Sequence, residues 1–262
     1  MLLRETGFTF NGLHSRDDMG LQYVEKDGHT IIPRIERNAY EIAGVSGTVL
    51  MPGETWKTIP FEGTLYPLQE RATQAEAQQM LRWVAAWLTA GRSRLIFDYE
   101  PGVYYLAELS GQSKWSLKNW FGGELPVQFE AQPYAYNVSE DSATVTTANE
   151  NATVSINVNT GKIVPAKIQV QNIGSAPIGG VWVNGIAMAG MELTSGQTLT
   201  INMESPIGAT IDRDGNIENA LPYAYYFPIV HLYGGVNDIG FLLSYGSGTK
   251  GARITVSGRG RW

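Results

Sequence analysis

Phe129-Glu130-Ala131-Gln132-Pro133-Tyr134-Ala135-Tyr136 divides the chain into two halves with different sequence patterns. Before this stretch, one strongly amphipathic helical segment stands among short strand segments. After it, only strand and turn patterns occur, down to the final Arg-Gly-Arg-Trp. Hydrophobic periodicity is the main sequence signal of secondary structure, and it changes here. The sequence therefore predicts two domains, residues 1–136 and residues 137–262.

Length and composition bound the class of protein. A chain of 262 residues is long enough for about two domains, each with its own core. Its 30 glycines favour a turn-rich, mainly β protein. The absence of Cys excludes disulfide frameworks and thiolate chemistry, and it fits assembly in a reducing cytoplasm. The net charge is −6 and the positive charges are scattered, so no basic face for nucleic acid is visible.

The chain shows no targeting or membrane pattern. The first residues, Met1–Gly7, are charged from Arg4 and lack an apolar core, so we expect no signal peptide. No run of about 18 apolar residues occurs, so we expect no membrane span.

A helix over residues 74–90 is the clearest expected element. Thr73 and Glu76 have the spacing of a capping box at its start. Gly91 is suited to end it in the left-handed conformation. One apolar face collects five side chains at helical spacing: Ala77, Met80, Leu81, Val84 and Leu88.

Four further side chains near this helix are open to interpretation. Trp83 and Trp87 lie on the shoulder of the apolar stripe, where they either cover the edge of the core or dock a neighbouring subunit. Arg92 and Arg94 follow the helix and suit the negative end of its dipole.

The strands expected in the first half are short and separated by Gly- and Pro-containing breaks, with turns at Asn11-Gly12, Met51-Pro52-Gly53 and Glu100-Pro101-Gly102. They are Phe8–Phe10, a strand from Leu21, Ile31–Ile35, Tyr40–Gly44, Trp56–Tyr66, Arg94–Tyr99, Val103–Leu109, Trp115–Phe121 and Pro126–Gln132.

The second half is expected to be an antiparallel sandwich, because strand patterns follow one another roughly every 10 to 14 residues. Residues 137–142 are polar without apolar periodicity and read as a linker. Hairpin turns are expected at Asn159-Thr160-Gly161, Asn184-Gly185 and Asp214-Gly215. The expected strands are Ala152–Val158, Ala166–Asn172, Gly180–Asn184, Ile186–Met188, Thr198–Met203, Thr210–Ile211, Tyr226–Val230, Ile239–Ser244 and Arg253–Ser257.

No motif predicts catalysis. The sequence has no P-loop, dinucleotide-binding glycine pattern or nucleophile elbow. Asp98 and Glu100 share one strand face and could form an acid–base pair, but we expect no His or activated nucleophile nearby, so we interpret them as turn-stabilising. We therefore expect no catalytic and no cofactor-binding residues.

Metal and basic sites are not expected either. Asp212–Asn216 superficially resembles a calcium loop, but Ile217 and Tyr223 replace the required Gly and Glu, so a hairpin turn fits better. The three histidines, His14, His29 and His231, are far apart, without ligand spacing. The only basic cluster is Arg253, Arg259 and Arg261, which is either a solvated tail or a contact for an acidic partner.

The order of motifs along the chain resembles the distal tail protein (Dit) family of long, flexible-tailed phages. The Gly190–Trp262 segment is the most specific part, although Tyr233-Gly234-Gly235 stands where the family often has Pro-Gly. The motifs are Asn11-Gly12 with Asp17-Asp18 before Gly20-Leu21, Met51-Pro52-Gly53, Asp98–Tyr105, Pro133–Tyr136, Leu193–Gly196, Thr210-Ile211-Asp212, Phe227-Pro228-Ile229 and Gly235-x-Asn237-x-Ile239.

This resemblance implies a structural virion protein and not an enzyme. It implies a β-sandwich-like, ring-forming first domain with the one helix, and a galectin-like second domain. The ring would be a homo-hexamer, or a back-to-back dodecamer in isolation. It would lie at the tail tip or baseplate after assembly in the host cytoplasm. Its partners would be the tail tube protein, the tail-associated hub protein and receptor-binding or baseplate proteins. DNA would only pass through the channel.

Two other classes remain open. The second half could be a carbohydrate-binding module that contacts host wall sugar, with Trp182, Tyr223, Tyr225 and Tyr226 as candidate stacking residues. A wall glycosidase would need a pair of carboxylates in a recognisable setting, and the sequence shows none.

Overall fold

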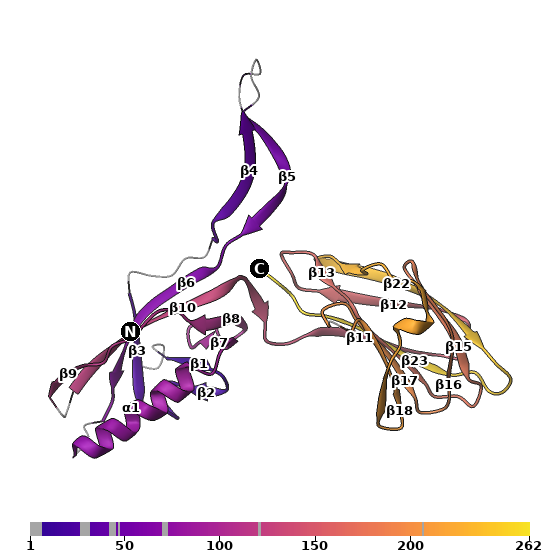
Figure 1. The fold of residues 1–262 in the computed structure, drawn as a ribbon. Helices are drawn as coiled ribbons and strands as arrows, with labels where there is room; N and C mark the ends of the chain where they lie inside the picture. Colours follow the sequence, from indigo (N-terminus) through magenta and orange to yellow (C-terminus); the bar gives the residue numbers. More distant parts are fainter. Residues whose placement is uncertain are drawn as a thin grey trace. The chain divides into compact units, whose positions relative to one another are not determined.

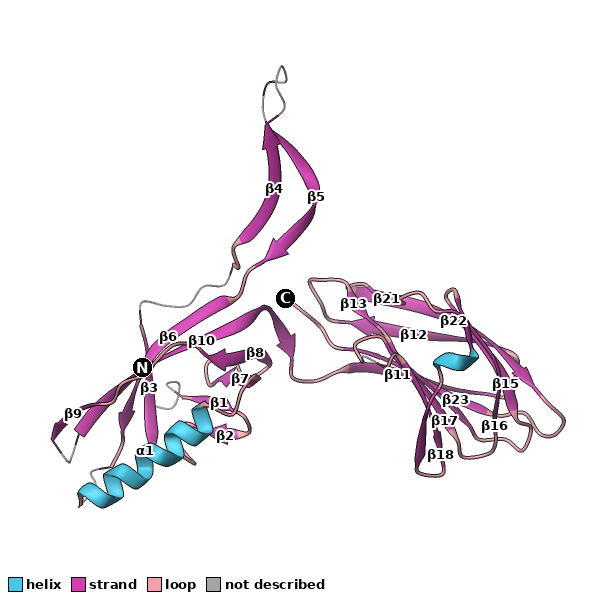
Figure 2. Cartoon of the chain, viewed as in Figure 1, coloured by secondary structure: helices cyan, strands magenta, loops and turns pink. Residues whose placement is uncertain are grey.

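The computed structural model describes residues 7–26, 32–41, 46, 48–69, 73–119, 122–205 and 207–262 (Figure 1). The chain forms two compact units, residues 1–138 and residues 139–262. The described residues form many antiparallel strands and one α-helix (Figure 2). The predicted mainly β fold class with one helix is therefore confirmed.

The first unit is built on an eight-stranded sheet. In spatial order its strands are β2 (Leu13–His14), β1 (Phe8–Phe10), β7 (Ser93–Phe97), β8 (Val103–Leu109), β10 (Gly122–Asn137), β6 (Ile59–Pro67) and β3 (Leu21–Glu25), with β9 (Ser116–Asn119) paired to β10. Phe8 and Tyr23 belong to strands far apart in this order, yet their ring centroids are 5.1 Å apart. The sheet therefore curls around a shared aromatic core.

The single helix, α1 (Gln74–Leu88), covers this core. The hydroxyl of Thr73 accepts a hydrogen bond from the Glu76 amide (3.3 Å), which confirms the predicted N-cap. Thr89 caps the other end, and Gly91 has a φ of 84°. This is the left-handed conformation expected after a helix.

The buried face of α1 differs from the predicted stripe. Trp87 is buried, not on the shoulder: it stacks on Phe8 at 5.5 Å and donates from Nε1 to the Phe10 carbonyl (2.8 Å). Its ring finds both an aromatic surface and a hydrogen-bond acceptor on β1, which is what a buried indole requires. Met80 and Leu81 are only partly buried as a result.

A separate hairpin of β4 (Ile35–Glu41) and β5 (Thr48–Trp56) forms a two-stranded sheet. The structure has one strand, β4, where two strands were predicted, Ile31–Ile35 and Tyr40–Gly44. Residues 31 and 42–44 lie outside the described residues. The predicted strand Trp56–Tyr66 is divided, because Trp56 ends β5 and β6 begins at Ile59.

The predicted turn Met51-Pro52-Gly53 lies inside β5. On the opposite strand, β4, the pairing register shifts between Arg37 and Ala39. A proline has no N–H for a ladder hydrogen bond, and such an irregularity accommodates it.

The second unit contains a six-stranded and a five-stranded sheet. The first has the order β11 (Asp141–Thr147), β23 (Ala252–Gly258), β14 (Lys167–Asn172), β17 (Thr198–Asn202), β18 (Ala209–Arg213) and β19 (Asn216–Asn219). The second has the order β12 (Asn151–Val158), β22 (Gly235–Tyr245), β15 (Ile178–Val183), β16 (Ile186–Leu193) and β20 (Ala224–Tyr226). The short pair β13 (Val164–Pro165) and β21 (His231–Leu232) and a 3₁₀ turn, Leu221–Tyr223, complete this unit.

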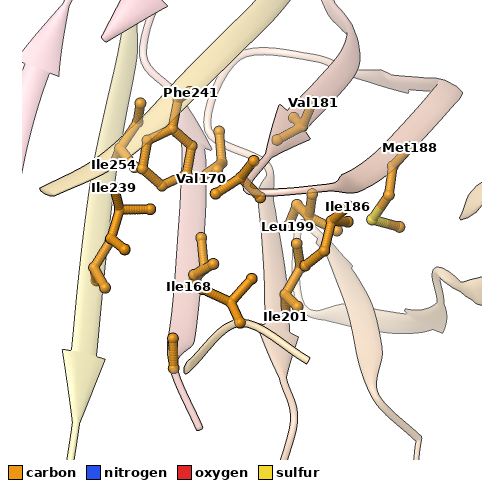
Figure 3. Packing of buried hydrophobic residues seen from close by; sticks show 14 of the residues in the cluster. Ile168, Val170, Val181, Ile186, Met188, Leu199, Ile201, Ile239, Phe241 and Ile254 are labelled. Carbon is orange, nitrogen blue, oxygen red and sulfur yellow. The ribbon is translucent and has the colours of Figure 1, made fainter. Parts of the chain in front are cut away.

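The two sheets share one hydrophobic core, as expected for a sandwich. Ile168 and Val170 of the six-stranded sheet belong to the same buried cluster as Ile186 and Phe241 of the five-stranded sheet (Figure 3). Alternate residues of most of these strands are buried, so each strand contributes one face to the core.

Several boundaries in this half differ from the predictions. Strand β10 continues to Asn137 and β11 begins at Asp141, so only residues 138–140 of the predicted linker 137–142 lie outside a strand. Of the predicted strand Tyr226–Val230, only Tyr226 is in a strand. The turn Asn159-Thr160-Gly161 follows β12, which pairs with β22, so it does not close a hairpin.

Candidate functional site

A His–Asp pair that was not expected from the sequence lies in the first unit. His14 Nε2 is 3.0 Å from Asp98 Oδ1, and the His14 amide donates to Asp18 Oδ2 (2.6 Å). The interpretation that no His accompanies Asp98 was therefore wrong. The two residues are 84 positions apart, and pairing of β1 with β7 brings them together.

This pair is built to fix a turn. The amide of Asp17 donates to His14 Nδ1 (3.1 Å), so both ring nitrogens have partners. A side-chain carbon on Gly7 would lie 2.4 Å from Asp98 Oδ2 and 2.9 Å from His14 Nε2, so a larger residue there would displace the pair. No serine or other nucleophile is hydrogen-bonded to His14, so the triad arrangement of nucleophile, base and orienting acid is not present among the described residues.

Glu100 has a structural partner rather than a catalytic one. Its Oε2 accepts from the Tyr105 hydroxyl at 3.5 Å. Burial first, and the negative Glu100 second, raise the pKa of Tyr105 to about 12. Glu100 therefore holds the end of its turn and does not face Asp98 as a partner acid.

The Asp212–Asn216 loop is a hairpin turn, as predicted. Asp214 and Gly215 have φ values of 55° and 92°, and the Gly215 amide donates to Asp212 Oδ1 (2.7 Å). Arg213 at the end of β18 donates to Glu218 on β19 (3.0 Å) and to the Met191 carbonyl on β16 (2.7 Å), which connects the six-stranded and the five-stranded sheet.

The remaining histidines do not form a metal site in the described part of the chain. His231 is exposed on β21, and His29 lies outside the described residues. Across the described ranges, no group of three or more His, Cys, Asp or Glu side chains is arranged to hold a metal ion. No helix among them is both long and apolar enough to span a membrane.

The basic tail is docked onto the second unit, which corrects the interpretation of a solvated tail. Arg259 Nη2 lies 3.0 Å from Glu140, and its side chain is only 18% exposed. Arg261 is paired with Glu204, and its carbonyl accepts hydrogen bonds from Gly161 and Lys162. These ion pairs neutralise two of the three arginines within the chain.

One groove lies between α1 and the loop before β3. It has a volume of about 580 Å³, and its lining includes Met19, Met80 and Trp83 beside charged Asp17 and Glu76. Trp83 is 65% exposed, in contrast to the buried Trp87. The two tryptophans therefore differ: Trp87 covers the core, whereas most of the Trp83 side chain is exposed.

A second groove lies on the outer face of the five-stranded sheet. It has a volume of about 460 Å³ and includes Trp182, Leu242 and Gly240. Tyr225 and Tyr226 are strongly exposed on the edge strand β20, whereas Tyr223 packs against the core. Of the four predicted stacking residues, Trp182 lines this groove.

Comparison with known proteins gave a match by structure but none by sequence. No protein-family model and no curated protein matches the sequence. Among solved structures, a phage adsorption hub protein has the same fold, with a TM-score of 0.61 at 13% identity. The similarity covers 97% of this chain and 98% of the other.

That structure is the Dit (gp 19.1) protein of SPP1, a paradigm of the hub adsorption apparatus in phages that infect Gram-positive bacteria. The chain thus has a Dit-like fold over nearly its whole length, and the resemblance recognised in the sequence is confirmed by structure. At 13% sequence identity, this structural similarity establishes the fold of the chain.

Proposed function

We propose that the protein is a distal tail protein, a structural component that joins the tail tube of a phage to its host-adsorption apparatus. The observation that carries this proposal is the Dit-like fold over 97% of the chain. In this proposal residues 1–138 form a hexameric ring, and the galectin-like sandwich of residues 139–262 contacts receptor-binding or baseplate proteins. A tail tube protein and a tail-associated hub protein contact the ring, which lies in the virion at the tail tip.

The β4–β5 hairpin supports self-assembly. It forms a sheet of two strands, and no third strand pairs with either of them among the described residues. A two-stranded hairpin alone is marginally stable in water, because it buries too little apolar surface. An edge of a neighbouring subunit would provide the missing partner.

Trp83 supports the same conclusion. A side chain of this size that is 65% exposed beside a groove is typical of interface residues, because Trp contributes much binding energy when it is desolvated. We propose that a neighbouring subunit covers Trp83 and the groove along α1.

The test compares two variants that place the same charge on α1. Trp83→Glu should weaken the oligomer, because a carboxylate would be buried at the subunit contact. Ala85→Glu is the control, since Ala85 is exposed and lies about 200° around the helix from Trp83. Light scattering measures the mass of each variant, and thermal unfolding checks that both are folded.

A folded Trp83→Glu protein with reduced mass, beside an Ala85→Glu protein of unchanged mass, supports the proposed contact. Equal masses for the two variants and the wild type would place the subunit contact elsewhere.

A further inference from the structure

The groove on the outer face of the five-stranded sheet combines a flat aromatic side chain with a glycine floor. On β15, Gly180 and Trp182 are two residues apart and therefore lie on one face. A side-chain carbon on Gly180 would lie 2.5 Å from Cη2 and 2.7 Å from Cζ3 of Trp182. The far end of the indole therefore lies over Gly180, and the outward side of Trp182 lines the groove.

The floor beside this indole is open. Gly240 lies on β22, where a side-chain carbon would meet no atom within 4 Å. Its neighbour across the ladder on β12 is Thr153. Leu242, which pairs with Trp182, is 44% exposed and extends the apolar wall. Trp182 and Leu242 thus line the same groove as Gly240, together with polar side chains.

The polar groups at the rim are available to a ligand. Asn151 and Thr153 on β12 and Asn184 in the β15–β16 turn line the groove, and all three are exposed. Asn184 is held at φ 40° by its turn, which fixes its position. Within the described part of the chain, none of these three side chains makes a hydrogen bond to another residue.

The charge of the groove narrows the class of ligand. Its lining residues carry no charge, whereas the groove beside Trp83 is lined by Asp and Glu side chains. The nearest acid on β22 is Asp238, whose Oδ1 accepts from Ser155 (2.5 Å). A phosphate or carboxylate ligand would find no cation among the lining residues.

We infer that this groove binds a neutral sugar ring. The C–H face of a pyranose can lie on the outward face of Trp182, because the indole face is electron-rich. Its hydroxyls can pair with the amides of Asn151 and Asn184 and the hydroxyl of Thr153. Small-molecule sites combine an apolar surface with a few polar groups in this way. The inference is independent of ring formation and adds a glycan contact to the proposed hub.

The test titrates the intact protein with neutral oligosaccharides of glucose, mannose, galactose and N-acetylglucosamine, and with a glycerol-phosphate oligomer. Tryptophan fluorescence and ligand-observed NMR measure binding. At least one neutral oligosaccharide should bind saturably, and the glycerol-phosphate oligomer should not. Binding of the phosphate oligomer alone, or of none of these probes, would overturn the inference.

Two variants locate the site. Trp182→Ala removes the stacking surface, and Gly240→Val fills the floor where no atom would clash; each should weaken binding at least about tenfold. The control is Tyr225→Ala, an exposed aromatic outside the groove. Undiminished binding by folded Gly240→Val would show that the sugar lies elsewhere and would contradict the inference.

Discussion

At the scale of single residues, buried tyrosines set a property of the first unit. Tyr23 and Tyr105 lie there, and burial is the first cause that raises the pKa of each. The carboxylates of Glu25 and Glu100 contribute further, because a negative neighbour disfavours a phenolate. These hydroxyls stay protonated in the folded unit well above the pH at which an exposed tyrosine ionises.

This predicts alkaline unfolding of the first unit. A group whose pKa is higher in the folded state contributes stability that is complete below its unfolded pKa and is lost as the pH rises. For Tyr105 that loss falls between pH 10, its ordinary value, and about pH 12. Tyr105→Phe should move the unfolding to higher pH, as measured by circular dichroism against pH.

Tyr66→Phe is the matched control, because Tyr66 lies in the same unit and is 38% exposed. Identical alkaline unfolding of Tyr105→Phe and the wild type would show that ionisation of Tyr105 does not limit stability in this range.

At the scale of elements, α1 shows what the sequence could predict and what it could not. Capping and the Gly91 stop are local, so the pattern of residues predicted the helix to within two residues at its end. The role of Trp87 depends on Phe8 and the Phe10 carbonyl, more than 70 positions away, so periodicity alone placed it wrongly.

Strands follow the same rule. Val103–Leu109 was predicted with its observed bounds, because it lies between clear turns. Strand β11 was missed because none of its residues is fully buried, so it lacks the apolar alternation of a half-buried strand. The same holds for the candidate sites. Trp182 was recognised from the sequence as a candidate stacking residue, whereas its groove and the His14–Asp98 pair arise from strand pairing.

The buried face of α1 predicts the effect of a charge. Val84 is 1% exposed within the aromatic core, so Val84→Asp should lower the free energy of unfolding by about 3 kcal/mol or more. The control is Gln78→Asp, an exposed position on the same helix that should change stability by about 0.5 kcal/mol or less. Chemical denaturation measures the free energy of unfolding of both variants. Equal loss in both variants would mean that α1 packs through another face.

The β4–β5 hairpin predicts an effect on assembly rather than on folding. Ile35 and Trp56 face each other across the ladder, so an Asn-Gly dipeptide can replace residues 36–55 as a tight turn. The shortened protein should keep the thermal unfolding of the eight-stranded sheet but form a weaker oligomer. If the shortened protein assembles as strongly as the wild type, the hairpin is not part of the subunit contact.

At the scale of the whole molecule, the two units have different construction. The first has one curled sheet, a helix and a separate hairpin; the second is a sandwich with its own core. The exposed Trp83 and the β4–β5 hairpin both belong to the first unit, and the neutral groove belongs to the second. This division fits a protein in which one unit assembles and the other makes peripheral contacts.

The most direct test of the proposed hub is the mass of the intact protein in solution, measured by light scattering over a range of concentrations. One chain has a mass of 28.7 kDa, so six copies give about 172 kDa and a back-to-back pair of rings about twice that. We predict one of these two masses, with closed rings in electron micrographs. A mass of 28.7 kDa at every concentration, with no rings in the micrographs, would contradict the account.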